Sequence, residues 1–257
     1  MSENSKKMRK KAIVLAAGKG TRMKSELPKV ICPVLGRPMI DYVLDALDSA
    51  GVDEVVVVVG FRGDLVREAI ANRANVRFVE QTGQLGTGHA VMSAQSELEG
   101  FDGPVFVIAG DSPLLRAESI EALFEEYERR SASGNLAAAI LGTVVKESPF
   151  GMGRILRDAQ GMFLGIVEEK DATEEQRKIT EINMSYYVFH APDLLDALGA
   201  LRTDNAQGEY YLTDVPAILR TRGQSVLALP VLQKCEALGV NRVEDLIPVE
   251  AALRELG

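Results

Sequence analysis

The chain of 257 residues contains no tryptophan, only two cysteines and only two histidines. Cys32 and Cys235 form no zinc-site or disulfide pattern, and we expect both to be small buried apolar residues. No Ser/His/Asp or Cys/His arrangement is indicated around His89 or His190. A reaction through a covalent intermediate on the protein is therefore not expected. What remains is catalysis by positioning and charge neutralisation.

Basic residues are also fewer than acidic ones. The chain has 29 Lys and Arg against 37 Asp and Glu, a formal net charge of −8, whereas proteins that bind nucleic acid non-specifically usually carry a basic surface. No apolar run approaches the length of a membrane span. The basic, polar start at residues 1–11 is followed by a run too short for a signal-peptide core. We therefore expect a cytoplasmic protein with no nucleic-acid or membrane partner.

The composition is otherwise that of a globular protein, 46% apolar and 26% charged, at a length that can bury a full α/β core. In the first half, short β-rich runs alternate with helical patterns. The expected strands are residues 12–16, 55–59, 76–79 and 105–109, and the expected helices are residues 37–50, 65–72, 87–95 and 117–130. This order predicts an α/β fold with a Rossmann-like, doubly wound, mostly parallel sheet.

The second half changes character and predicts a smaller mixed α+β lobe. Its expected strands are residues 136–143, 154–156, 162–167, 183–189 and 226–229, the second and third forming a hairpin, and its expected helices are residues 193–201 and 213–222. Thr213 is the expected N-cap of the last of these. We expect a domain over about 11–242, divided into a nucleotide part at 11–135 and a lobe at 136–230, and then a C-terminal helix at 243–257. Ligands of such sheets lie outside the carboxyl ends of the strands.

The first expected strand leads into the sequence LAAGKGTRM at residues 15–23, which we call the glycine-rich loop, followed by LPK at residues 27–29. Two glycines let the backbone turn tightly and direct N–H groups toward an anion. The cationic residues of the segment are Lys19, Arg22, Lys24 and Lys29. Neither a dinucleotide fingerprint nor a Walker loop has this spacing. The segment predicts a site for nucleotide phosphates, with an ordinary strand–helix turn as the alternative.

Asp111 follows the apolar strand at residues 105–109, within the sequence AGDSPL at residues 109–114. A carboxylate at the end of a central strand lies at the rim of the expected cleft, and Mg²⁺ prefers carboxylate oxygens that it shares with substrate phosphates. Asp111 is therefore the candidate metal ligand. Helix capping is the alternative, because Asp-Ser-Pro is also a common helix start.

The sequence QTGQLGTGH at residues 81–89 follows the strand at residues 76–79 and forms a second expected loop. Its amide and backbone groups offer the donors and acceptors that a pyrimidine base needs, with Gln81 as the leading side chain. The alternative is a loop in which Thr87 caps the next helix. We expect His89 to be a packed or capping histidine rather than a catalyst.

Three positions of the second half could hydrogen-bond the hydroxyl and amide groups of a sugar: Gly153 in FGMGR, Glu168 in VEEKD and Asn183 in EIN. Glu168 also fits a solvated run of charges. Asn241 in LGVNR fits an ordinary turn.

Together the motifs resemble the uridylyltransferase domain of bacterial N-acetylglucosamine-1-phosphate uridylyltransferases, within the sugar-nucleotidyltransferase superfamily. In order along the chain they read LAAGKGTRM with LPK, QLGTGHA, GDSPL, VEEKDAT, EIN, NAQGEYYLTD and GVN. The likeness runs from about Lys11 to about Arg242. The first motif marks the wider superfamily, whereas NAQGEYYLTD at residues 205–214 and QLGTGH at residues 84–89 are more specific.

The resemblance implies a role for each matching position. Arg22, Lys29 and Asp111 would be catalytic, with Arg22 and Lys29 holding the triphosphate, and Asp111 and Asn241 would bind Mg²⁺. Residues contacting the nucleotide would be Leu15, Ala16, Ala17, Gly18, Lys29, Gln81, Gly86, Thr87, Ala109, Gly110 and Asp111, of which Gln81, Gly86 and Thr87 would read uracil. Gly153, Glu168 and Asn183 would contact the amino sugar.

In the implied reaction, N-acetylglucosamine 1-phosphate attacks the α-phosphorus of UTP in line, giving UDP-N-acetylglucosamine and pyrophosphate. Ala109, Met152 and the pair Met184-Ser185 depart from the family pattern near the sugar or ribose. Transfer with another sugar 1-phosphate or nucleotide is therefore the main alternative, and a non-catalytic sugar-nucleotide-binding protein is a second. The missing third glycine disfavours a dinucleotide oxidoreductase.

Members of that family usually carry a C-terminal acetyltransferase of hexapeptide repeats folded as a left-handed β-helix. No such repeat occurs in these 257 residues. The trimer associated with the β-helix is therefore not assumed.

Overall fold

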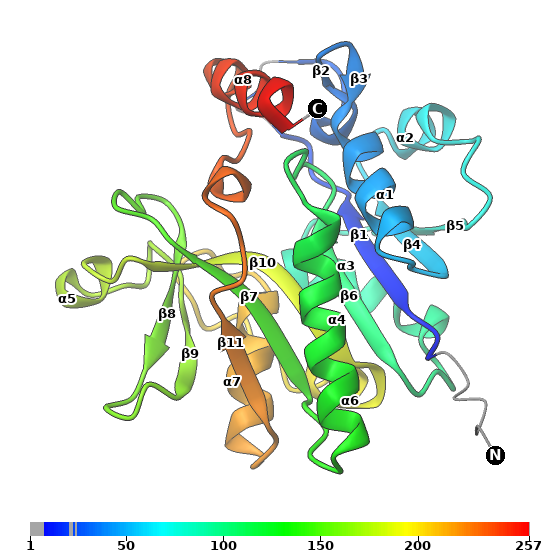
Figure 1. The fold of residues 1–257 in the computed structure, drawn as a ribbon. Helices are drawn as coiled ribbons and strands as arrows, with labels where there is room; N and C mark the ends of the chain where they lie inside the picture. The colour runs from blue at the N-terminus through cyan, green and yellow to red at the C-terminus, as the bar shows by residue number, and fades with distance from the viewer. Residues whose placement is uncertain (1–7, 21–22, 24, 257) are drawn as a thin grey trace.

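The computed structural model describes residues 8–20, 23 and 25–256. It forms a nine-stranded mixed sheet whose main path runs β11-β7-β10-β6-β1-β4-β5 (Figure 1). The strands of the first half are β1 (Lys11–Ala16), β4 (Glu54–Val59), β5 (Val76–Glu80) and β6 (Pro104–Ala109). These four pair in parallel, as the sequence predicts.

The helices of the first half are α1 (Met39–Ser49), α2 (Gly63–Ala69), α3 (Thr87–Ser93) and α4 (Ala117–Ala132). Helix α1 begins two residues later than expected, because Arg37–Pro38 (β3) pairs with Pro33–Val34 (β2) in a small separate ladder. Proline at the N-cap then leads directly into the helix.

The second half adds strands to the same sheet and a hairpin beside it. Its strands are β7 (Ala139–Val145), β8 (Gly153–Arg157), β9 (Phe163–Val167), β10 (Glu181–His190) and β11 (Val226–Leu229). Strand β10 is antiparallel to β6, β7 and β8. We call residues 146–183, which contain β8, β9, the short helix α5 (Glu174–Arg177) and the start of β10, the hairpin lobe.

The remaining helices are α6 (Ala191–Leu198), α7 (Val215–Thr221) and α8 (Leu246–Leu256). The prediction that Thr213 caps the helix before residue 222 is wrong. Residues Leu212–Asp214 form a 3₁₀ turn, and α7 begins after Asp214 without a side-chain cap. The hydroxyl of Thr213 instead hydrogen-bonds the carboxyl group of Glu168.

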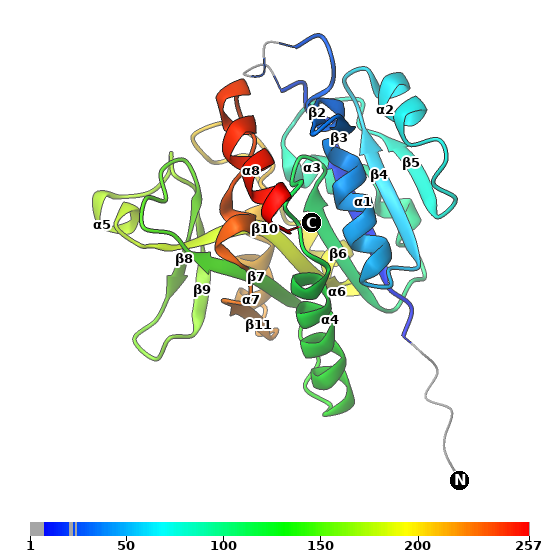
Figure 2. The ribbon, with the colours of Figure 1, turned by 45° about the horizontal axis from the view of Figure 1, so that its top comes forward.

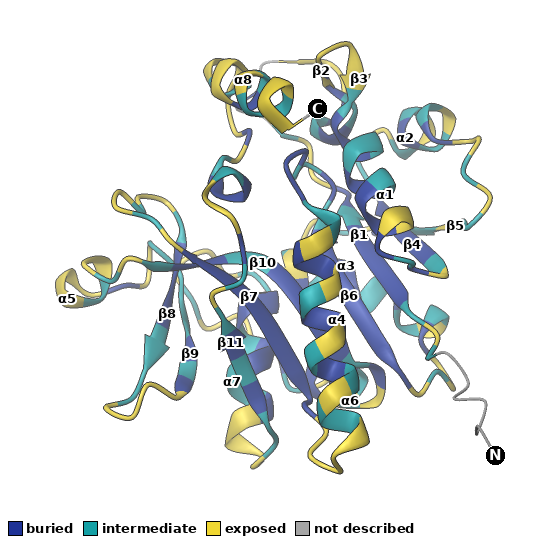
Figure 3. Ribbon diagram, viewed as in Figure 1, coloured by how far each residue is buried: buried dark blue, intermediate teal, exposed yellow. Residues whose placement is uncertain are grey.

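The core lies on both faces of the parallel strands. Alternate residues of β4 illustrate this: Val55, Val57 and Val59 pack with α1 and α4, whereas Val56 and Val58 pack with α3 and α6. All five valines are buried, as suits a parallel sheet covered on both sides (Figure 3). Cys32 is buried as expected, but Cys235 is only partly buried, because it lies in the 3₁₀ turn Lys234–Ala237 at the surface.

Helix α8 packs beside β2 through a small third cluster that includes Val249, Val34 and Met39 (Figure 2). The same cluster includes Met23 and Leu114, which follow β1 and β6, so the C-terminal segment is attached near the carboxyl ends of these strands. Within the described ranges, no helix combines the length and the apolar character needed to cross a membrane.

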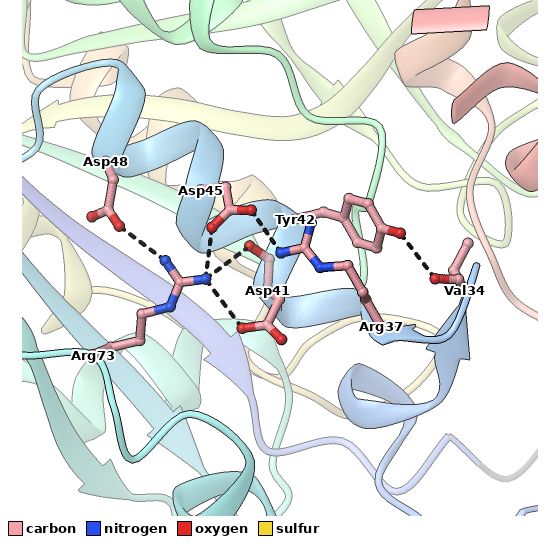
Figure 4. A network of polar contacts seen from close by, with 7 residues as sticks. All are labelled: Val34, Arg37, Asp41, Tyr42, Asp45, Asp48 and Arg73. Atoms are coloured by element: carbon pink, nitrogen blue, oxygen red, sulfur yellow. Dashed lines mark hydrogen bonds and ion pairs between the residues drawn. The ribbon is translucent and has the colours of Figure 1, made fainter. Parts of the chain in front are cut away.

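Helix α1 is held to the edge of the sheet by a cluster of charges (Figure 4). Arg73, from the loop before β5, donates to Asp45 at 2.6 Å, to Asp48 at 3.0 Å and to Asp41 at 3.2 Å. These aspartates lie on one face of α1, and Arg37 donates to Asp45 as well, at 2.7 Å. Burial raises the pKa of Asp45, but hydrogen bonds from the two guanidinium groups outweigh it, so that the pKa is lowered overall.

Candidate active site

A pocket of about 330 Å³ opens at the carboxyl ends of β1 and β6, large enough for part of a small-molecule ligand. We call it the nucleotide pocket. Of the residues predicted to contact a nucleotide, it is lined by Leu15, Ala17, Gly18, Lys29, Gln81, Gly86, Thr87, Ala109 and Asp111. Its other lining residues are Gly20, Val30, Gln84, Ala90 and Glu209. The sequence motifs from three separate regions therefore meet at one cavity.

Two predicted contacts lie behind this lining rather than in it. Ala16 is 1% exposed within β1. Gly110 donates its N–H to the carbonyl of Leu15 at 2.9 Å, and a Cβ at this glycine would lie 3.1 Å from Val14. Gly110 thus allows the ends of β1 and β6 to approach each other closely.

The glycine-rich loop has a structural role that its spacing does not reveal. Gly20 has φ of +62°, and a Cβ there would lie 2.6 Å from the Cβ of Lys29. Glycine is needed at this position both for the left-handed backbone and for the close approach of Lys29. Thr21, Arg22 and Lys24 lie outside the described residues, so the role assigned to Arg22 stays a prediction.

Lys29 joins the two predicted metal ligands. Its ammonium group lies 2.5 Å from Oδ2 of Asp111 and donates to Oδ1 of Asn241 at 3.2 Å. The side chains of Lys29 and Asp111 are 14% and 26% exposed. Asp111 follows β6, whereas Lys29 lies in the 3₁₀ turn Lys29–Ile31 and Asn241 in the segment before α8. The fold thus brings together a cation and two oxygen ligands that are far apart in the sequence.

The contacts of Asp111 and Asn241 test the two alternatives, that Asp111 caps a helix and that Asn241 lies in an ordinary turn. Helix α4 begins after Arg116, so Asp111 does not cap it. Asn241 does lie in a turn, where its backbone N–H donates to Oδ2 of Asp245 at 2.7 Å. The turn leaves its side-chain oxygen directed at Lys29. The turn interpretation of Asn241 and its interpretation as a ligand are therefore compatible.

Gln81 is 7% exposed and is held firmly at one wall of the nucleotide pocket. Its Nε2 donates to the carbonyl of Gly86 at 3.2 Å and lies 3.0 Å from Nδ1 of His89. His89 is also stacked on Tyr210, with ring centroids 6.4 Å apart. It is thus a packed residue that contacts Gln81.

The motif at residues 205–214 packs against the base-reading loop predicted at residues 81–89. The backbone N–H of Tyr210 donates to the carbonyl of Leu85, and the backbone carbonyl of Tyr210 accepts from the N–H of Gly88, each at 2.8 Å. The N–H of Leu212 donates to the hydroxyl of Thr87 at 3.1 Å. Thr87 does not cap α3, whose N-cap is Gly86. The family resemblance is the signal that points to this motif, and the structure shows that Tyr210 and Leu212 support the loop while Glu209 lines the nucleotide pocket.

The three predicted sugar contacts meet in the hairpin lobe. Asn183 is opposite Gly153 in the β10–β8 register. A Cβ at Gly153 would lie 3.5 Å from Oε1 of Glu168 and 3.6 Å from the Cβ of Asn183. The closest contact of that Cβ would be with Ile166 of β9, at 3.1 Å, so Gly153 allows β8 and β9 to pack closely beside the two polar side chains.

Asn183 is buried and Glu168 is partly buried, and the hydrogen-bond partners of both are neutral groups. Asn183 is 7% exposed, donates to the hydroxyl of Tyr187 at 2.6 Å and accepts from the N–H of Ser185 at 3.1 Å. Burial raises the pKa of Glu168, and the hydroxyl of Thr213 offsets this only in part. Glu168 is thus partly removed from water, whereas Lys170 and Asp171 of the same charged run are exposed.

Strand β10 connects the two clusters. Tyr187 of β10 is opposite Val107 of β6 in an antiparallel pair. Asp111 lies four residues after Val107, and Asn183 lies four residues before Tyr187. Both side chains therefore belong to the same end of the pair, although none of Gly153, Glu168 and Asn183 lines the nucleotide pocket.

The model of the MobA-like NTP transferase domain family matches residues 12–214. The chain is 47% identical over 244 residues to the bifunctional protein GlmU of Heliobacterium modesticaldum, covering 95% of this chain and 52% of that protein. It is 47% identical over 230 residues to GlmU of Listeria innocua, with 90% and 49% covered. The chain thus spans about half the length of these relatives.

Among solved structures, a UDP-glucose pyrophosphorylase complexed with UDP-glucose superimposes with a TM-score of 0.73 at 20% sequence identity. The match covers 97% of this chain and 100% of that structure. At this identity the likeness concerns the fold alone.

Proposed function

The chain belongs to the family of MobA-like NTP transferase domains, and from that premise we propose that it transfers a uridylyl group from UTP to N-acetyl-α-D-glucosamine 1-phosphate. The products would be UDP-N-acetylglucosamine, a precursor of cell-wall polymers, and pyrophosphate. The observation that carries this proposal is the contact of Lys29 with both Asp111 and Asn241 beside the nucleotide pocket. The motifs of the chain and its similarity to GlmU proteins support the choice of substrates.

The oxygen ligands at this contact fit a divalent cation. A carboxylate oxygen of Asp111 and an amide oxygen of Asn241 both lie within 3.2 Å of the same ammonium group. Carboxylate and amide oxygens are the hard ligands that Mg²⁺ accepts, together with water and substrate phosphates. Asp111 and Asn241 would hold Mg²⁺, which when bound would neutralise charge on the phosphates.

The other residues would bind and orient the two substrates. Lys29 and Arg22 would hold the triphosphate, and backbone N–H groups of the loop at residues 17–20 would face it. An oxygen of the sugar phosphate would form a bond to the α-phosphorus while the bond from that phosphorus to the bridging oxygen breaks. The electron pair leaves with pyrophosphate. Because the attacking oxygen is already anionic, no general base is required.

Substrate recognition would be divided between the two clusters. Gln81, Gly86 and Thr87 would contact uracil from the wall of the nucleotide pocket. Glu168 and Asn183 would hydrogen-bond the acetamido sugar, and Gly153 would contact it. The substrates of this reaction are consistent with a cytoplasmic location.

The test is release of pyrophosphate by the purified chain with Mg²⁺, using UTP, CTP and ATP in turn against the 1-phosphates of N-acetylglucosamine, glucosamine and glucose. We expect the fastest release with UTP and N-acetylglucosamine 1-phosphate. Equal turnover with CTP or ATP would contradict the assignment of Gln81 to uracil. Faster release with another sugar 1-phosphate would instead favour the alternative acceptor suggested by Met152 and Met184.

A further inference from the structure

We propose that Lys29 closes the metal site of the nucleotide-free protein: its ammonium group takes the place of the divalent cation between Asp111 and Asn241. The side chain would leave this position when the phosphates of a nucleotide enter the pocket. The proposal rests on the proposed function, because that function assigns Asp111 and Asn241 to a metal.

The geometry places one cation where another is expected. The ammonium nitrogen of Lys29 lies 2.5 Å from Asp111 and 3.2 Å from Asn241. A metal ion bound to both oxygens would have to lie close to the same point. The side chain of Lys29 is 14% exposed and that of Asp111 is 26% exposed. Because water screens this site only in part, two positive charges in contact there would repel each other strongly. The metal and the ammonium group therefore exclude each other.

The backbone of Lys29 is fixed whereas its ammonium group can move. The carbonyl of Lys29 accepts from the N–H of Cys32 at 3.0 Å, within a 3₁₀ turn. On the other side its Cβ packs against Gly20. The remaining stem is a flexible chain that ends in a compact charge. Rotation of the stem alone can therefore redirect the charge without moving the loop.

The pocket gives the ammonium group a second destination. Lys29 itself lines the nucleotide pocket, as do Gly18 and Gly20 of the glycine-rich loop. A triphosphate held there offers several anionic oxygens to Lys29. Moving to these oxygens would free Asp111 and Asn241 for the metal. Nucleotide and metal would then bind cooperatively, each increasing the affinity for the other.

The proposal predicts that removing the charge of Lys29 improves metal binding to the protein without nucleotide. The probe is Mn²⁺, added to the full chain and followed by the electron paramagnetic resonance of the free ion. We expect Lys29→Met to bind Mn²⁺ about tenfold or more tightly than the unchanged protein, the usual size of a coupling between two sites. Lys29→Gln should show the same increase in Mn²⁺ affinity, and it replaces Lys29→Met in the test if the methionine variant does not fold.

Two further variants test the origin of the gain. Lys178→Met removes an exposed lysine that pairs with Glu175 and should leave Mn²⁺ affinity unchanged. Lys29→Met combined with Asp111→Asn should lose the added affinity. If the unchanged protein binds Mn²⁺ as tightly as the Lys29 variants, or if those variants bind none, the proposal is overturned. No turnover is measured, so this outcome is distinguishable from a failure to release pyrophosphate from UTP.

Discussion

The nucleotide pocket and the three predicted sugar contacts of the hairpin lobe place their polar side chains in different electrostatic surroundings. In the pocket, a lysine and an aspartate lie in direct contact at 2.5 Å, and both are partly exposed. In the lobe, Asn183 is buried against a tyrosine hydroxyl, and Glu168 has the hydroxyl of Thr213 as its neutral partner. The pocket is thus suited to groups whose charge must be neutralised, and the lobe to groups that are recognised by hydrogen bonds.

Their construction differs in the same way. The pocket residues follow parallel strands, whose carboxyl ends meet at one edge of the sheet. The lobe residues lie in or directly after antiparallel strands, where register brings Asn183 opposite Gly153. Charge at the phosphates and shape at the sugar would therefore be altered by different substitutions.

The largest effect is expected at Asp111. Asp111→Asn keeps the shape of the side chain but removes the charge that faces Lys29 and the proposed metal, so turnover should fall by about a hundredfold or more. The carboxylate is partly exposed and lies at the rim of the sheet, so the melting temperature should change little. Pyrophosphate release and circular dichroism measure the two quantities. Near-normal turnover would contradict the metal assignment.

A smaller but still large effect is expected from Gly20→Ala. The new Cβ would lie 2.6 Å from that of Lys29 and would displace it, which predicts about a ten- to hundredfold loss in kcat/KM for UTP. Gly36→Ala is the matched control, because Gly36 also has positive φ, +79°, but no atom of the residues that the structure describes lies within 4 Å of the added group. Equal losses in both variants would show that backbone strain alone, rather than the position of Lys29, limits the rate.

Arg73→Met tests whether charge contacts outside the nucleotide pocket affect stability without affecting substrate binding. Loss of the contacts to Asp41, Asp45 and Asp48 should lower the free energy of unfolding by about 1–2 kcal/mol. The KM values of both substrates should not change. Denaturant unfolding at several pH values measures the effect.

The pH dependence of the Arg73 effect follows from the lowered pKa of Asp45. A carboxyl group with a lowered pKa contributes stability above its unfolded-state pKa, and this is lost as the pH falls through the folded-state value. The difference between Arg73→Met and the unchanged protein should therefore shrink in acid. A difference that grows in acid would contradict this explanation.

A smaller effect on stability than that of Arg73→Met is expected from neutralising Glu168. Because its folded-state pKa is raised, the stability linked to its proton is complete below the unfolded-state pKa and is lost as the pH rises through the folded-state value. Glu168→Gln should therefore raise the melting temperature at neutral pH. Glu169→Gln should lower it, since it would leave Arg154, 2% exposed, without its ion pair at 2.7 Å. Shifts of the same sign in both variants would show that the lobe does not distinguish these carboxylates as described.

The parallel sheet could be predicted because its strands are continuous apolar runs. Val55–Val59 of β4 is an example, and the last strand, Val226–Leu229, has the predicted bounds. The start of α1 could not be placed, because it depends on the pairing of β2 with β3. The N-cap assigned to Thr213 failed because its hydroxyl has a partner far away in sequence. Local patterns do not contain such tertiary contacts.

In the candidate site, too, the residues with a local sequence signal could be predicted, and the contacts formed on folding could not. The glycine-rich loop, Gln81 and Asp111 stand out because each follows an apolar strand, and they do line one pocket. Asn241 had no local signal and was named only through the family resemblance. The packing of Gly20 on Lys29 and the burial of Glu168 appear only when the chain is folded. Sequence thus identified the residue types, whereas their surroundings required the structure.

The most direct test of the division between pocket and lobe is the pair of KM values for Glu168→Gln, measured by pyrophosphate release with UTP and N-acetylglucosamine 1-phosphate varied independently. The substitution replaces one carboxylate oxygen of the partly buried Glu168, an acceptor, with an NH2 group that can only donate, which should raise KM for the sugar phosphate about tenfold and leave KM for UTP unchanged. An increase in KM for UTP, with no change for the sugar phosphate, would contradict the assignment of the lobe to the sugar.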